Sequence, residues 1–305
     1  MIMVMFKRIV LFCISVCFYQ GASASIISTA ITAETYSVSY PEPDKGERVH
    51  DTGMEFASVL SRSQIYDTGV YAFAYVEANA LGFALLSMGK YKASAASGSA
   101  AISYQLENNS LVAQQFSLRF SPLSGYLKAY CADPENLFYE DTGSRLPCIG
   151  EDFAVSSYNA RITLNDELIW SSMAEVRSGN NGVDVVTDGA VLGAFDAETH
   201  SYHWGTQWFE LPLGVFDPNE QFNLVYSVDV LTDGVTNLQG ATACEHFNCP
   251  YADNVALVDY GFRQLDVDND SLFQFSSSAL PVDVPPKLGA ILIGLFLLVG
   301  RLKKT

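Results

Sequence analysis

The chain has 305 residues, of which 34 are acidic and 17 are basic, so its formal net charge at pH 7 is −17. Between residues 25 and 280 the imbalance is larger, because 33 acidic and 11 basic residues give a net charge of −22. This charge makes nucleic acid and anionic lipid surfaces poor partners, so we expect no nucleic acid, and it favours divalent cations and neutral or cation-bridged polysaccharides. The hydrophobic content of 49% argues against disorder, so we expect this stretch to bury a core as one domain.

The N-terminal residues have the three parts of a secretory signal peptide. Residues 1–8 include two basic residues, residues 9–19 form an apolar run, and residues 22–24 (Ala-Ser-Ala) supply the small residues of a cleavage site. We therefore expect residues 1–24 to be removed and the mature chain to begin near Ser25, outside the cytoplasm.

A repeat of small residues precedes the first clear strand pattern. Residues 93–101 read Ala-Ser-Ala-Ala-Ser-Gly-Ser-Ala-Ala. In isolation such a stretch is typical of a flexible linker. Because it runs without a break into a strand pattern, we favour an edge strand with small side chains that a neighbouring loop covers.

Hydrophobic alternation with a period of two dominates the chain that follows. Apolar and polar residues alternate over residues 102–106 and again over 116–120, and Asn-Asn-Ser at residues 108–110 has the composition of a turn. This pattern predicts a hairpin with one buried face.

Two further hairpins are predicted in the same way. Residues 158–164 and 168–170 flank Asn165 and Asp166, and residues 208–211 and 222–228 flank a turn at residues 217–220. No segment of the body has a sustained helical stripe. We therefore expect an all-β fold, an antiparallel β-sandwich or jelly-roll-like single domain over residues 25–280.

Four cysteines lie in the expected mature chain, an even number that suits an oxidising compartment. They are Cys131, Cys148, Cys244 and Cys249. Three pairings are formally possible, and we favour the local one, Cys131 with Cys148 and Cys244 with Cys249, because each pair brackets a polar loop. Closing the longer loop, of about 18 residues, stabilises the fold by roughly 3 kcal/mol.

One loop has the spacing of a calcium ligand set. Asp266, Asp268 and Asp270 alternate along the chain, so that several carboxylate oxygens can face one ion. An EF-hand requires Gly at its sixth and Glu at its twelfth position, where this chain has Ser271 and Ser277. The alternatives are a calcium loop of another kind and a solvated acidic turn. We expect no cofactor other than this possible Ca²⁺.

A short span rich in aromatic residues is a candidate carbohydrate site. It contains Tyr202, Trp204 and Trp208, and exposed aromatic faces beside acidic groups are how many β-sandwich modules hold sugar rings. The alternative is that these side chains belong to the core, as Trp residues of a β-sandwich commonly do.

The sequence lacks the signatures of the common hydrolases. The Gly-x-Ser-x-Gly motif of a nucleophile elbow does not occur. His200 and His203, with Glu198 nearby, do not have the His-Glu-x-x-His spacing of a zinc protease. We therefore expect no enzymatic activity.

The C-terminal residues 281–305 form a separate segment with three parts. A helix-breaking stretch contains Val284, Pro285 and Pro286, an apolar run covers residues 288–300, and a basic end contains Arg301, Lys303 and Lys304. At 1.5 Å per residue the apolar run spans roughly 20 Å, against about 30 Å for the hydrocarbon core of a bilayer. Such a segment suits a signal that is held in the membrane and then cut.

This arrangement resembles the PEP-CTERM sorting signals of Gram-negative bacteria. Val284 and Pro285 match the start of the usual Val-Pro-Glu-Pro, whereas Pro286 and Lys287 stand where Glu and the second Pro are expected. The resemblance implies an exosortase-like membrane protease as a partner and an association with exopolysaccharide. An uncut single-pass anchor is the alternative, and both arrangements place the basic end inside the cell.

These features together predict a non-enzymatic protein of the cell surface or extracellular biofilm matrix of a Gram-negative bacterium, with exopolysaccharide as its associated polymer and the membrane contacted through the tail. The alternative is a carbohydrate-binding, lectin-like adhesin built on the same scaffold.

Overall fold

The computed structural model describes residues 24–39, 46–54, 56–65, 70–79, 82–90, 93–122, 124–132, 145–146, 148, 152–235, 252–258 and 273–279. Every regular element in these ranges is a β-strand, and every strand pairing is antiparallel. The expected all-β, antiparallel class is therefore confirmed for the described part of the chain. Within that part, no helix is long and apolar enough to cross a membrane.

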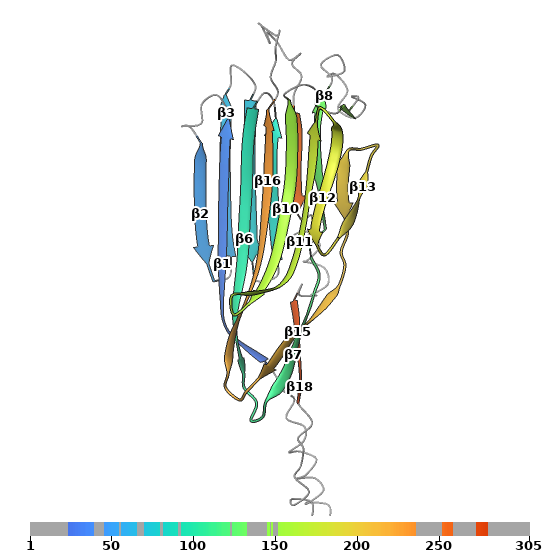
Figure 1. Ribbon diagram of the computed structural model, residues 1–305. Coiled ribbons are helices and arrows are strands. Elements are labelled where there is room, and N and C mark those ends of the chain that lie inside the picture. Colours follow the sequence, from blue (N-terminus) through green and yellow to red (C-terminus); the bar gives the residue numbers. More distant parts are fainter. Residues whose placement is uncertain are drawn as a thin grey trace, which may run out of the picture.

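The largest described elements form a seven-stranded sheet whose long strands follow the long axis of the body (Figure 1). In spatial order its strands are β12 (Gly182–Gly189), β11 (Glu167–Gly179), β10 (Phe153–Leu164), β16 (Gln221–Val235), β6 (Ala93–Asn108), β1 (Ala24–Ser39) and β2 (Glu47–Gly53).

A second sheet of eight strands packs against the first one. Its strands in order are β13 (Gly193–Asp196), β14 (Ser201–Trp204), β8 (Gly125–Ala132), β17 (Ala252–Val258), β5 (Gly82–Lys90), β4 (Val70–Asn79) and β3 (Phe56–Ile65), with β9 (Arg145–Leu146) paired to β8. A third sheet lies at one end of the body (Figure 1) and consists of β15 (Phe209–Phe216), β7 (Gln114–Phe120) and β18 (Phe273–Ala279).

Alternating burial along the strands shows how the sheets face each other. In β16 every second side chain from Phe222 to Thr232 is buried, and the side chains between them face outward. β7 has the same period. One continuous apolar core combines β1, β6, β10 and β16 with residues of β3, β4, β5 and β8. Burial of this apolar surface between the sheets is the main stabilising contribution to such a body.

The predicted hairpin around Asn165 and Asp166 is confirmed. β10 and β11 pair over nearly their whole length, from Ala154 opposite Ser178 to Leu164 opposite Glu167. Asn165 and Asp166 have φ values of 50° and 68°. Two consecutive residues with positive φ are the requirement of a type I′ turn, and Asn and Asp are among the residues that tolerate it.

The other two predicted hairpins are wrong in their pairing. β6 pairs with β1 and β16, whereas β7 pairs with β15 and β18. β15 and β16 likewise belong to different sheets. The strands and turns occur where the alternation placed them, but at both turns the chain leaves the seven-stranded sheet or enters it.

Asn108 forms hydrogen bonds at both places where the chain passes between the seven-stranded and three-stranded sheets, after β6 and before β16. Its side-chain amide is buried and donates to three backbone carbonyls, those of Val112, Phe216 and Asp217, at 3.0, 2.8 and 3.2 Å. Its backbone N–H donates to the carbonyl of Glu220 at 3.0 Å, and its carbonyl accepts from the N–H of Asn219 at 2.8 Å. The bond to Phe216 is buried, and a buried backbone carbonyl needs a partner, so the Asn108 side chain supplies a hydrogen bond where the chain passes from one sheet to another.

The Ala/Ser repeat is a strand, but it does not lie at an edge as expected. It forms the first part of β6, which lies between β16 and β1 in the middle of its sheet. At Gly98 an added Cβ would lie 2.7 Å from Val76 Cγ2 of the opposite sheet. The small residues are therefore needed because the two sheets approach closely here.

The disulfide between Cys131 and Cys148 is confirmed, with an S–S distance of 2.06 Å. The second predicted pair, Cys244 and Cys249, lies outside the described residues, as do the predicted signal peptide up to residue 23 and the tail from residue 281.

Candidate functional site

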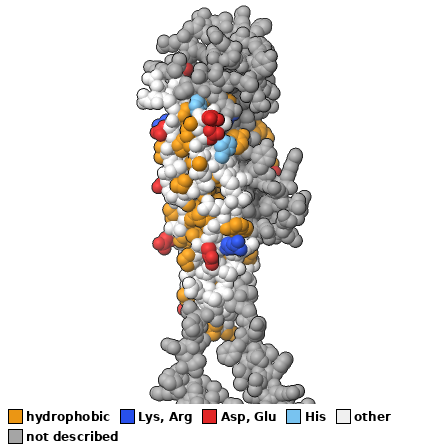
Figure 2. Space-filling model, turned by 90° about the vertical axis from the view of Figure 1, so that its right-hand side faces the viewer, with side chains coloured by type: hydrophobic (Ala, Val, Ile, Leu, Met, Phe, Trp, Pro, Cys, Tyr) orange, Lys and Arg blue, Asp and Glu red, His pale blue; other side chains and the backbone are white. Residues whose placement is uncertain are grey.

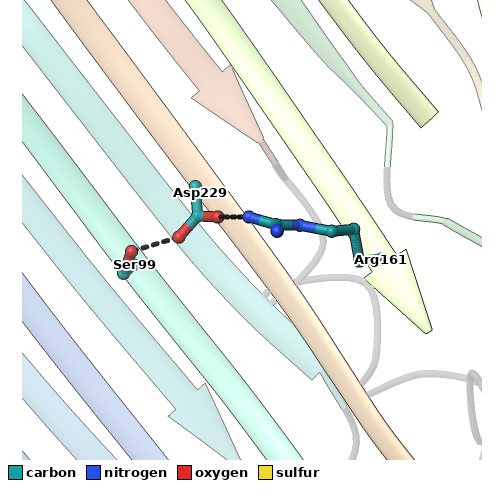
Figure 3. A network of polar contacts seen from close by, with 3 residues as sticks. All are labelled: Ser99, Arg161 and Asp229. Carbon is teal, nitrogen blue, oxygen red and sulfur yellow. Dashed lines mark hydrogen bonds and ion pairs between the residues drawn. The ribbon is translucent and has the colours of Figure 1, made fainter. Parts of the chain in front are cut away.

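The outer face of the seven-stranded sheet carries small and polar side chains across its central strands. Arg161, Asp229 and Ser99, from β10, β16 and β6, meet across this face (Figure 3). The Arg161 Nη2 to Asp229 Oδ2 distance is 2.9 Å, and the two side chains are 47% and 40% exposed. An ion pair this exposed contributes little stability, so its main effect is to neutralise charge on the face.

A groove of about 350 Å³ lies on the same face, toward the turn between β10 and β11. Its lining residues come from β1, β6, β16 and that turn, and they are Ser28, Ala30, Ser103, Gln105, Asn165, Gln221, Phe222 and Asn223. Among these described residues, none carries a charge. Four side-chain amides and two hydroxyls therefore give the groove its polar character.

Hydrogen bonds between the glutamines fix one side of the groove. Ser28 Oγ donates to Gln105 Oε1 at 3.3 Å, and Gln105 Nε2 donates to Gln221 Oε1 at 3.1 Å. Gln221 Nε2 is 3.5 Å from Glu107 Oε2. Both glutamine oxygens are thus occupied as acceptors by groups within the protein.

On the other side of the groove, the side-chain oxygens of the two asparagines also accept hydrogen bonds from the protein. Ser103 Oγ donates to Asn223 Oδ1 at 2.9 Å, and the Asn223 backbone N–H donates to Asn165 Oδ1 at 2.8 Å. The Asn165 N–H donates in return to the Asn223 carbonyl at 2.8 Å. Within the described residues, the side-chain NH₂ groups of Asn165 and Asn223 donate to no protein group. The groove consequently presents hydrogen-bond donors to a ligand.

A second groove, of about 520 Å³, lies on the three-stranded sheet. It is lined by Gln115, Ser117, Glu210, Pro212, Ser276, Ser277 and Ser278. Ser117 and Ser276 share a hydrogen bond of 2.6 Å across β7 and β18. Its lining is mostly hydroxyl groups, with one carboxylate.

The predicted aromatic sugar site is corrected by the burial of two of its residues. Tyr202 and Trp204 are 2% and 6% exposed and belong to the core, where Trp204 lies 4.4 Å from the ring of Tyr158. Trp208 alone of the three is exposed, at 42%, with the Arg119 guanidinium 4.6 Å from its ring centroid. Tyr202 and Trp204 are two residues apart in β14 and so lie on the same face of the strand, which faces inward, whereas His203 between them is exposed. They do not form an exposed platform.

The structure also shows a polar chain along β14 that the sequence did not single out. Ser201 Oγ lies 2.6 Å from His203 Nε2, and Thr199 Oγ1 donates to Asp196 Oδ2 at 2.8 Å. The bond from Thr199 is the main cause that lowers the pKa of Asp196. Ser201 is only 2% exposed, so its hydroxyl is largely shielded from a substrate. The spacing of this pair is that of a nucleophile and its base, but burial of the Ser201 side chain argues against that role.

No group of three or more potential metal-binding side chains occurs among the residues that the structure describes. Asp266, Asp268 and Asp270, the predicted calcium ligands, fall outside those residues. On the face that carries the β12 and β13 edge, charged side chains are few and scattered among hydrophobic and polar ones (Figure 2). In the described residues on this face, nothing concentrates charge as a metal or phosphate site requires.

Comparison with known proteins gives no family. No family model matches the chain, and no curated protein matches it. Among solved structures, a chain from the infectious bursal disease virus Gt strain is 9% identical with a TM-score of 0.10, over 89% of this chain and 72% of that chain. A chain from the Gx strain of that virus is 8% identical with a TM-score of 0.08, over 91% and 74%. Scores this low carry no argument about fold or function.

Proposed function

We propose that the chain is a non-enzymatic, exported protein of the cell surface or extracellular matrix of a Gram-negative bacterium, associated with exopolysaccharide. One observation carries the proposal. The Cys131–Cys148 disulfide ties β8 to the segment before β10, and structural disulfides form and persist outside the reducing cytoplasm. The signal-like residues 1–24 agree with this location.

The tail is the second part of the proposal. Residues 281–305 act as a sorting signal that an exosortase-like membrane protease cuts near Val284 and Pro285, after holding the protein transiently in the inner membrane. The mature body, residues 25–280, is then one β-sandwich domain. The facing seven- and eight-stranded sheets support a sandwich, and a jelly-roll-like arrangement is part of the same proposal.

The experiment follows the protein in its own cells. Replacing Arg301, Lys303 and Lys304 together with Gln removes the charges that keep the tail's end in the cytoplasm. The unchanged protein should be recovered outside the cell with the polysaccharide, whereas the variant should accumulate in the cell envelope. Substituting Lys45, Lys90 and Lys92 in the body by Gln is the matched control for lost positive charge. Equal delivery of both variants would contradict the sorting role.

A second candidate function is carbohydrate binding by an adhesin on the same scaffold. The observation that favours it is the uncharged, amide-lined groove on the outer sheet face. Tyr202 and Trp204 do not support it, because both are buried.

A further inference from the structure

We propose that the groove lined by Gln105, Asn165, Gln221 and Asn223 binds an uncharged sugar unit of a polysaccharide. The inference rests on the proposed export of the chain to a polysaccharide-containing surface. It names the binding site and the chemical class of the polymer.

Hydrogen-bond polarity is the first argument. The amide oxygens of all four residues accept bonds from groups of the protein itself. The NH₂ groups of Asn165 and Asn223, in contrast, donate to none of the described residues. A fitting ligand therefore supplies acceptors, as sugar hydroxyl, ring and N-acetyl oxygens do.

Charge is the second argument. The described lining holds no Lys or Arg that would neutralise an anionic sugar, and the body carries a net charge of −22. An acidic polysaccharide is therefore repelled at long range and left without a counter-charge on arrival. A metal ion is also a poor ligand, because the amide oxygens that would coordinate it are already hydrogen-bonded. A neutral sugar meets neither obstacle.

Rigidity and access are the third argument. Ser28, Gln105, Asn165 and Gln221 are exposed, so a ligand can reach them. The amides are held in place by the bonds between them and by the type I′ turn at Asn165, where φ is 50°. A site whose polar groups are fixed before binding loses less conformational entropy when the ligand arrives. The volume of about 350 Å³ lies at the small end of ligand pockets, which suits a short glycan segment.

The test uses the purified exported protein and a panel of neutral oligosaccharides, including gluco-, manno-, galacto- and N-acetylglucosamine oligomers, with oligogalacturonate as the acidic comparison. Titration calorimetry should find at least one neutral oligomer that binds. The double variant Asn165→Gly with Asn223→Ala should weaken that binding about tenfold, because two donors to the ligand are lost. Gly at position 165 tolerates the positive φ of the turn.

The control is Asn159→Ala, which removes an amide from β10 on the same face but outside the groove. It should bind the oligomer like the unchanged protein. In ¹⁵N NMR spectra, the side-chain NH₂ signals of Asn165 and Asn223 should shift on addition of the sugar. A melting curve close to that of the unchanged protein establishes that the double variant is folded.

Two results would overturn the inference. One is that no neutral oligomer binds the folded protein. The other is that binding occurs but is the same in the double variant, which would locate the sugar elsewhere. Either result leaves the proposed function standing if the protein is still delivered to the surface. Sugar binding by a protein that stays in the cytoplasm would instead contradict the proposed function, whereas the sugar-binding role of the groove would still hold.

Discussion

The two ends of the body's interior are packed by different kinds of side chain. Toward the start of β6, Ala72, Ala74 and Ala96 form a cluster in which every member is fully buried. Beside it, Ser87 Oγ bonds to the Ala96 carbonyl at 2.7 Å and to Thr232 Oγ1 at 2.8 Å. This end, the small-residue end, brings the two sheets close together with little side-chain volume between them.

The opposite end, the aromatic end, is filled by rings between the seven-stranded and three-stranded sheets. Phe120 is fully buried, and its ring centroid lies 5.0 Å from that of Trp170 and 5.5 Å from that of Phe209. Phe216 and Phe222 stack at 3.9 Å. Added volume should therefore lower stability most at the small-residue end, and lost volume should lower it most at the aromatic end.

The largest expected effect is the loss of a ring at the aromatic end. Phe120→Ala should lower the free energy of unfolding by about 3–5 kcal/mol, because it leaves a cavity among rings that cannot collapse into it. Chemical denaturation of the purified protein measures this. Leu111→Ala is the control, since Leu111 is 83% exposed and should change stability by less than about 0.5 kcal/mol. Similar small effects for both would mean that the rings are not a packed core.

The next effect concerns Asn108, whose hydrogen bonds link the chain segments that pass between the sheets at this end. Asn108→Ala should lower the free energy of unfolding by about 2 kcal/mol, because the buried Phe216 carbonyl and the partly buried carbonyls of Val112 and Asp217 lose a shared donor. Asn109→Ala is the matched control, since Asn109 is exposed and, among the described residues, its side-chain amide donates to the exposed Ser25 Oγ. Its effect should stay below about 0.5 kcal/mol. Equal losses for the neighbouring pair would contradict the role assigned to Asn108.

Added volume at the small-residue end comes third. Gly98→Ala should lower the free energy of unfolding by about 1–3 kcal/mol, because the new Cβ meets Val76 Cγ2 at 2.7 Å. Gly179→Ala is the control, because nothing lies within 4 Å of its added Cβ. It should be neutral or slightly stabilising through reduced entropy of the unfolded chain. A tolerated Ala at position 98 would mean that the sheets do not approach as closely as described.

The smallest effect separates two buried threonines. Thr35 Oγ1 has no hydrogen-bond partner among the described residues, whereas Thr232 Oγ1 bonds to Ser87. Thr35→Val should therefore raise the free energy of unfolding by about 1 kcal/mol and with it the melting temperature. Thr232→Val should lower both by a similar amount. Thermal unfolding of the two variants side by side checks this. Shifts of the same sign would show that the hydroxyl contacts do not distinguish the sites.

The sequence predicts the strands better than their partners, and the physical reason is local. A period of two identifies a strand and its buried face, and Asn165-Asp166 has residue types that favour the two-residue turn of a hairpin. The same period does not say which strand lies alongside, so β6 and β7 looked like a hairpin although Asn108 begins a crossing between sheets. The small residues of β6 likewise suggested an edge strand. The sequence of one strand does not show that a facing sheet approaches it closely.

The candidate site was harder to predict for a related reason. Gln105, Asn165 and Gln221 are far apart in the chain and meet only because β6, β16 and the β10–β11 turn are neighbours. No spacing between them could reveal the groove. Tyr202 and Trp204 were chosen as candidates by residue type alone, yet both lie on the face of β14 that packs into the core.

The most direct test of the account is the intact mass of the protein recovered outside the cell, measured without reduction and followed by peptide mapping. The account predicts a chain that begins near Ser25, ends near Val284, contains no free thiol, and carries the links Cys131–Cys148 and Cys244–Cys249. A surface protein that still ends at Thr305 would contradict cleavage of the tail and identify an anchored membrane protein. A recovered chain that begins at Met1 and has free thiols would contradict both cleavage of the signal peptide and formation of the disulfides.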